Sequence, residues 1–107
     1  MKYEITDSAR ADFSKLNENH KLLARAAMAT FAKACGDHND PNEISFPASL
    51  RVKPVQGAPG VFEMTWNFSA PDGRATFEWA SVTTEKGTTE PIVRWRRIGD
   101  HNVFKNP

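Results

Sequence analysis

The chain has 107 residues, which is enough for one domain with a single hydrophobic core and too few for two. Apolar residues make up 39% of it and charged residues 25%, a balance that excludes an intrinsically disordered chain, and no apolar run is long enough to span a membrane. The net charge of +1 excludes a protein that binds polyanions over its whole surface. We therefore expect residues 1–107 to form one globular domain.

The single cysteine and the first residues of the chain predict the cellular compartment in which the protein works. Cys35 is the only cysteine, so no internal disulfide can form. The N-terminus lacks the apolar segment of a secretory signal peptide. Both features favour a reducing, cytoplasmic setting. Cys35 should also lie at the C-terminus of a helix, where the pKa of a thiol is raised, so we do not expect it to act as a nucleophile.

The N-terminal half of the sequence predicts a short strand followed by a helical hairpin. Tyr3–Ile5 is the predicted strand, and Thr6 or Asp7 can cap the helix that follows. Apolar residues recur at helical spacing in Ala9–Leu16 and again in His20–Cys35. Because only a short polar break separates the two segments, they are typical of a helical hairpin.

After a polar loop over Gly36–Ser49, the apolar pattern changes to a period of two. The segments that alternate in this way are Leu50–Val55, Val61–Phe68, Arg74–Val82 and Ile92–Ile98. Ser69–Gly73, with its Pro and Gly, predicts a tight hairpin turn. The sequence therefore predicts an α+β fold, in which the N-terminal helical hairpin packs on a twisted antiparallel sheet of about four strands.

Alternation assigns the strand side chains to two faces of this sheet. The apolar face, which should cover the helices, holds Phe62, Met64, Trp66, Phe77, Trp79, Val93 and Trp95. The opposite, polar face holds five cations and two carboxylates: Arg51, Lys53, Arg74, Arg94, Arg96, Glu63 and Glu78. Strict alternation also places Arg97 on the apolar face.

The polar face and the C-terminal tail are the candidate functional features. Arginines bind phosphates bidentately, although Glu63 and Glu78 could simply pair with them on a solvated surface. Histidine exchanges protons near neutral pH, and a turn after Gly99 could fold His101 back over the sheet. Otherwise His101 is a surface residue in a loose tail. Phe104 could stack on a nucleobase or fill the core.

Metal and cofactor sites are not predicted. His20 and His38 have no partners at ligand spacing. Asp37–Asp40 resembles the start of a calcium loop, but no Glu stands at the twelfth position. The sequence has no phosphate loop and no dinucleotide-binding motif.

The order of these parts resembles the RelE/ParE toxin superfamily. Val61–Trp66 is similar to the Glu-Leu-Arg strand of that family, and Asp72–Phe77 to the arginine-bearing strand after its hairpin. Arg97–Phe104 resembles the closing segment with histidine and an aromatic residue. The resemblance implies a RelE-like fold and the toxin of a toxin–antitoxin pair.

Such a toxin would cut mRNA on the ribosome without a metal, and a cognate antitoxin peptide would hold it inactive. The resemblance implies that His101 is the acid or base, that Glu63 is its possible partner base, and that Arg74 and Arg96 stabilise charge. The implied RNA-binding residues are Arg51, Lys53, Arg94 and Phe104.

The sequence departs from the family pattern at two of these positions. Thr65 stands where the family has an arginine, and Phe104 replaces a tyrosine that could move a proton. Two alternatives therefore stay open: a RelE-like binding module without catalysis, and a toxin directed at gyrase.

Overall fold

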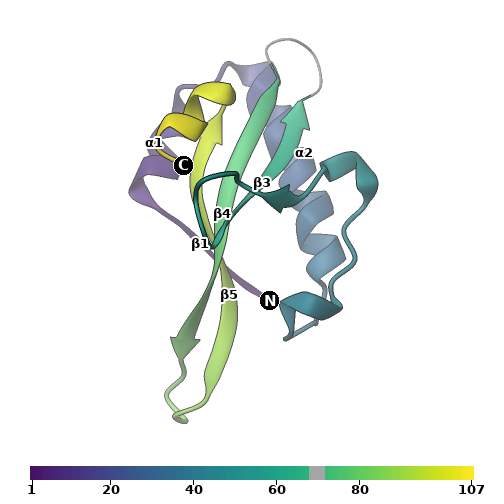
Figure 1. The fold of residues 1–107 in the computed structure, drawn as a ribbon, viewed down its shortest axis with the longest axis vertical. Coiled ribbons are helices and arrows are strands. Elements are labelled where there is room, and N and C mark those ends of the chain that lie inside the picture. Colours follow the sequence, from purple (N-terminus) through teal and green to yellow (C-terminus); the bar gives the residue numbers. More distant parts are fainter. Residues whose placement is uncertain (68–71) are drawn as a thin grey trace.

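Two helices and a five-stranded sheet form the fold in a computed structural model that describes residues 1–67 and 72–107 (Figure 1). The helices are α1 (Asp7–Ser14) and α2 (Glu18–Cys35). The strands are β1 (Lys2–Ile5), β2 (Lys53–Pro54), β3 (Val61–Asn67), β4 (Gly73–Thr83) and β5 (Thr89–Gly99). Short 3₁₀ helices are η1 (Pro41–Glu43), η2 (Ala48–Leu50) and η3 (His101–Lys105). The predicted α+β class is confirmed. Most of the predicted turn at Ser69–Gly73 lies outside the described residues.

Side-chain caps define where the two helices begin. The Thr6 hydroxyl accepts a hydrogen bond from the Ala9 amide at 3.1 Å, and the Asn17 side chain accepts one from the His20 amide at 2.7 Å. The second cap starts α2 at Glu18, two residues earlier than predicted. No helix in residues 1–67 and 72–107 is long and apolar enough to cross a membrane.

The sheet order is β1-β5-β4-β3-β2, and β1 pairs with β5 in parallel while the other pairs are antiparallel. The prediction of an antiparallel sheet of about four strands is therefore wrong in strand direction and number. Two-residue alternation reports which face a side chain occupies, but it does not report the direction of the neighbouring strand. Figure 1 shows α2 on one side of this sheet and η3, the yellow turn, on the other.

The strand predicted over Leu50–Val55 shrinks to the two residues of β2. Leu50 ends η2, and Arg51 follows in the left-handed region with φ of 46°. Extended pairing therefore starts only at Lys53. Arg51 consequently lies before the sheet and not on its polar face, which corrects its predicted position.

One extra residue in β5 resets the alternation of that strand. Phe77 pairs with Trp95, but the preceding residue of β4, Thr76, pairs with Arg97, so Arg96 has no opposite residue. As a result Ile98 joins the buried core, and Arg97 lies opposite a residue of the polar face. The predicted place of Arg97 on the apolar face is therefore wrong.

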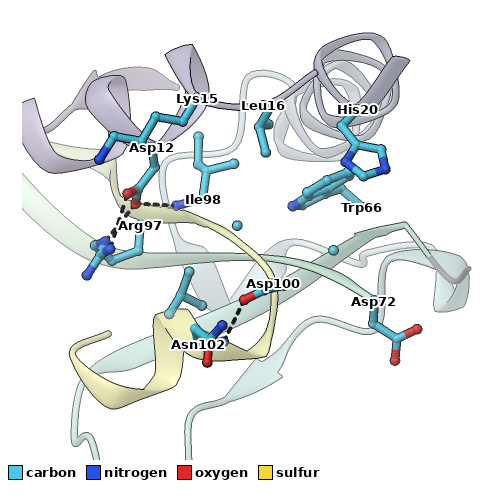
Figure 2. Close-up of a pocket in the computed structure, with 13 residues that line it drawn as sticks. Asp12, Lys15, Leu16, His20, Trp66, Asp72, Arg97, Ile98, Asp100 and Asn102 are labelled. Atoms are coloured by element: carbon cyan, nitrogen blue, oxygen red, sulfur yellow. Dashed lines mark hydrogen bonds and ion pairs between the residues drawn. The ribbon is translucent and has the colours of Figure 1, made fainter. Parts of the chain in front are cut away.

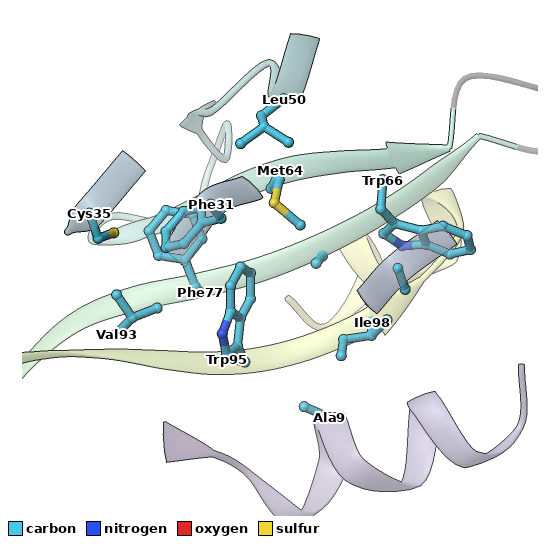
Figure 3. Packing of buried hydrophobic residues seen from close by; sticks show 12 residues of the cluster. Ala9, Phe31, Cys35, Leu50, Met64, Trp66, Phe77, Val93, Trp95 and Ile98 are labelled. Atoms are coloured by element: carbon cyan, nitrogen blue, oxygen red, sulfur yellow. The ribbon is translucent and has the colours of Figure 1, made fainter. Parts of the chain in front are cut away.

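The core lies between α2 and the apolar face of the sheet (Figure 3). The Phe31 ring of α2 is 4.9 Å from both the Phe77 and the Trp95 rings and 4.6 Å from Phe46. The predicted apolar face is confirmed: Met64, Trp66, Phe77, Val93 and Trp95 are buried, and Phe62 and Trp79 are partly buried. Burying each large side chain contributes about 1.5–3 kcal/mol.

Gly73 at the start of β4 packs directly against the Trp66 ring. A Cβ atom at this position would overlap the indole, because the Trp66 Nε1 donates to the Arg74 carbonyl at 2.9 Å and fixes the ring there. We expect Gly73→Ala to lower the free energy of unfolding by about 1–3 kcal/mol, measured by urea titration. The loss should shrink in a Trp66→Leu background, and an equal loss in both backgrounds would contradict this packing explanation.

Cys35 is fully buried at the end of α2. Burial raises the pKa of its thiol, while a hydrogen bond with Tyr3 opposes the rise. We therefore expect a thiol reagent to label native protein at pH 8 at least a hundredfold more slowly than urea-unfolded protein. Immediate labelling without urea would show that the end of α2 is open.

Candidate functional site

The C-terminal η3 folds back over the polar face of β4 and β5. Asp100 caps it by accepting a hydrogen bond from the Asn102 amide at 2.8 Å. Val103 is buried and packs closely against Gly99. This anchoring places both His101 and Phe104 over the sheet, with their rings edge to face at 5.5 Å.

A cavity of about 450 Å³ opens between β2, the polar face and η3. We call it the polar-face cavity. Five of the residues predicted to form the site line it together: Lys53, Glu63, Arg74, His101 and Phe104. The other lining residues are Pro54, Val55 and Gln56.

Charges alternate along one side of the polar-face cavity. Glu63 lies between Lys53, whose Nζ is 3.6 Å from its Oε1, and Arg74, whose Nε is 4.0 Å away. On the other side, Arg74 Nη2 donates to Asp72 Oδ2 at 3.3 Å. The same Asp72 oxygen is 3.7 Å from His101 Nε2. A row of five charged or ionisable groups thus runs from the Lys53 ammonium through Glu63, Arg74 and Asp72 to the His101 imidazole.

Arg74 is the buried centre of this row. It is only 8% exposed, and its Nε has no hydrogen-bond partner among the described residues. Leaving a buried donor unpaired costs about 1–3 kcal/mol, more for a charged group. An anion that entered the polar-face cavity could accept this hydrogen bond, because Arg74 lines the cavity.

Asp72 is a site residue that sequence reasoning missed. It stands before Gly73, so the pattern indicated only a turn residue. The signal was the charge sequence Asp72-Gly73-Arg74, because a turn aspartate just before a strand arginine can reach its guanidinium.

Arg94 and Arg96 lie in a different hollow, which we call the arginine hollow and which holds about 210 Å³. Glu78 accepts a hydrogen bond from Arg94 Nη1 at 3.0 Å and one from Arg96 Nη1 at 3.1 Å. The hydrogen bonds to Glu78 and then Glu4 raise the pKa of Arg94. The structure therefore does not bring Arg96 to the polar-face cavity with Arg74 and His101.

A third cavity of about 320 Å³ lies between the α1–α2 junction and residues 97–103 (Figure 2). Asp12 of α1 accepts hydrogen bonds from Arg97 Nε at 2.6 Å and from the Ile98 amide at 3.0 Å. These bonds with Asp12 raise the pKa of Arg97, although burial opposes the rise. None of the predicted site residues lines this space, and the paired charges fasten α1 to β5.

The Asp12 contacts predict a stability effect. We expect Asp12→Asn to lower the free energy of unfolding by about 1–3 kcal/mol, because it removes charge-assisted hydrogen bonds at a partly buried position. Urea titration measures the loss, and Glu85→Gln in the exposed β4–β5 loop is the control. Equal stability of Asp12→Asn and the control would show that the pair contributes nothing.

Metal ligands do not gather in the described part of the chain. Within residues 1–67 and 72–107, no three His, Cys, Asp or Glu side chains are placed to hold an ion together.

Comparison with known proteins assigns no family. No protein-family model matches the sequence, no curated protein is significantly similar to it, and no solved structure significantly resembles the fold. The polar-face cavity is therefore the feature on which a function can be based.

Proposed function

We propose that the protein is a cytoplasmic toxin that cuts RNA without a metal, with the polar-face cavity as its active site. One observation carries the proposal. An imidazole, a carboxylate, two cations and an aromatic ring, from segments far apart in sequence, line the same cavity. Transesterification of RNA needs a base, an acid and positive charge at the phosphate, and this set supplies all three.

Each side chain in this proposal has a role that its chemistry allows. Glu63 takes the proton of the 2′-hydroxyl, whose oxygen attacks the adjacent phosphorus. The bond from phosphorus to the 5′-oxygen breaks, and protonated His101, beside Asp72, gives that oxygen a proton. The products are a 2′,3′-cyclic phosphate and a free 5′-hydroxyl. Arg74 Nε and Lys53 stabilise the charge on the non-bridging oxygens.

Three of the remaining predicted residues act in RNA binding. Phe104, at the cavity wall, stacks on a base. Arg94 and Arg96 bind the RNA backbone at the arginine hollow, so Arg96 moves from a catalytic to a binding role in this proposal. Arg51 lines neither space and receives no role.

The partners in this proposal are ribosome-bound mRNA and a cognate antitoxin. The ribosome rests on the resemblance to the RelE/ParE superfamily. A protein partner gains support from the edge strand β1, whose four residues are all exposed. Beside it, Ile5, Phe13 and Met28 line an apolar hollow of about 310 Å³ that Arg10 and Arg25 border. An antitoxin segment with apolar and acidic side chains fits this surface.

A second candidate is an RNA-binding module without catalysis. Two observations favour it. Lys53 and Arg74 already pair with Glu63, the proposed base, and Phe104 has no group that could transfer a proton. In that case the polar-face cavity would hold a phosphate but would not cleave the chain.

Replacement of His101 tests the proposed reaction. We expect His101→Ala to lower the rate of RNA cleavage by about 10²–10⁴-fold, because the leaving oxygen loses its proton donor. The measurement is the appearance of 2′,3′-cyclic phosphate ends in purified translation reactions. His38→Ala removes an exposed histidine that pairs with Glu43 outside the cavity, so it is the matched control.

Each outcome of this experiment separates the candidates. Cleavage by His101→Ala at the rate of the unchanged protein would overturn the assignment. RNA binding without cleavage by the unchanged protein would favour the binding module. Intact RNA together with inhibited DNA supercoiling would indicate a toxin directed at gyrase.

A further inference from the structure

Three partly buried aromatic rings surround another hollow at the β2 edge of the sheet, which we call the aromatic hollow. Phe46 follows η1, Phe62 belongs to β3 and Trp79 to β4, and the space between them is about 280 Å³. Phe77 contacts the Trp79 ring edge to face at 5.6 Å and holds the indole in place. The other lining residues are Pro41, Asn42, Val52, Lys53 and Pro54.

The two residues of β2 separate the aromatic hollow from the polar-face cavity, and both line both spaces. Lys53 lies opposite Glu63 of the polar face, whereas Pro54 lies opposite Phe62 of the aromatic hollow. An extended chain that leaves the polar-face cavity over this edge therefore crosses a strand of only two residues before it reaches the rings.

The charge of the aromatic hollow suits a nucleic acid. None of its described lining residues is acidic, and Lys53 is its only charged side chain. The cavity in Figure 2 differs, because three aspartates line it against two cations, Lys15 and Arg97, and Arg97 is already paired with Asp12. Proteins that bind single-stranded RNA without sequence preference stack its bases on aromatic side chains. Such stacking contributes strongly to affinity.

We propose that the aromatic hollow is a nucleobase subsite, which binds the base of a nucleotide next to the cleaved linkage. This inference rests on the proposed RNA substrate. The base stacks on Trp79, and Lys53 binds the phosphate that joins it to the nucleotide in the polar-face cavity. The exposed amide of Asn42 lies at the wall of the hollow and reads the edge of the base.

Tryptophan fluorescence reports on this subsite directly. Trp66 and Trp95 are only 6% and 2% exposed, whereas Trp79 is partly exposed and lines the aromatic hollow, so Trp79 is the tryptophan that a ligand in this hollow contacts. The probes are 2′-O-methyl RNA pentanucleotides, which cannot be cleaved because the attacking hydroxyl is blocked. We expect them to quench the fluorescence, and Trp79→Leu to remove the quenching and raise Kd about tenfold.

Matched variants control for folding and for non-specific stacking. Trp79→Phe keeps a ring, so it should keep near-normal affinity while the quenching is lost. Tyr3→Leu removes an exposed aromatic residue from β1, at the opposite edge of the sheet, and should leave Kd unchanged. Asn42→Ala, at an exposed position, should reduce the discrimination among A, C, G and U pentanucleotides.

The outcomes distinguish this inference from the proposed cleavage. If the unchanged protein cleaves RNA while Trp79→Leu and Asn42→Ala bind the pentanucleotides as the unchanged protein does, the base subsite is wrong and the cleavage stands. If the pentanucleotides quench Trp79 but no RNA is cut, the subsite stands and the proposed reaction is wrong. Quenching that persists in His101→Ala would support a subsite separate from the proton donor.

Discussion

The burial of Arg74 under η3 is the constraint on which the polar face depends. A guanidinium that is 8% exposed needs opposite charge nearby, and Glu63 and Asp72 provide it from β3 and from the turn before β4. Lys53 and His101 then approach the outer sides of these two carboxylates. The row of charges is therefore a structural requirement of the buried arginine as well as a candidate catalytic arrangement.

The buried Arg74 makes its part of the polar face different from an ordinary solvated surface. Glu78 pairs with Arg94 and Arg96 and largely satisfies them, in the way that a solvated face would. Around Arg74 the pairing is incomplete, since its Nε and the hydroxyl of fully buried Thr76 have no partners among the described residues. Unsatisfied buried donors next to a cavity create an affinity for anions, whereas paired surface charges create little.

The sequence predicted the core and the two faces well, because alternation of large apolar residues has a direct physical cause in burial. It predicted Trp95 and Phe77 on the apolar face but did not place the extra residue Arg96, because strict alternation was continued through the two consecutive arginines that mark the bulge. The position of Arg51 was predicted wrongly, because an arginine in the sequence gives no sign that its backbone will adopt the left-handed conformation. Asp72 was missed because its role depends on a side chain that arrives from η3, some thirty residues later.

The parallel pairing of β1 with β5 has a consequence for how the protein is made. Lys2–Ile5 are synthesised long before their sheet partners Ile92–Trp95, and His101 and Phe104 follow later still. Contacts so distant in sequence form late and slowly, so β1 can pair only after β5 has been synthesised, and the polar-face cavity can close only after η3. The polar-face cavity is therefore one of the last parts of this domain to form, because its walls come from both β2 and η3.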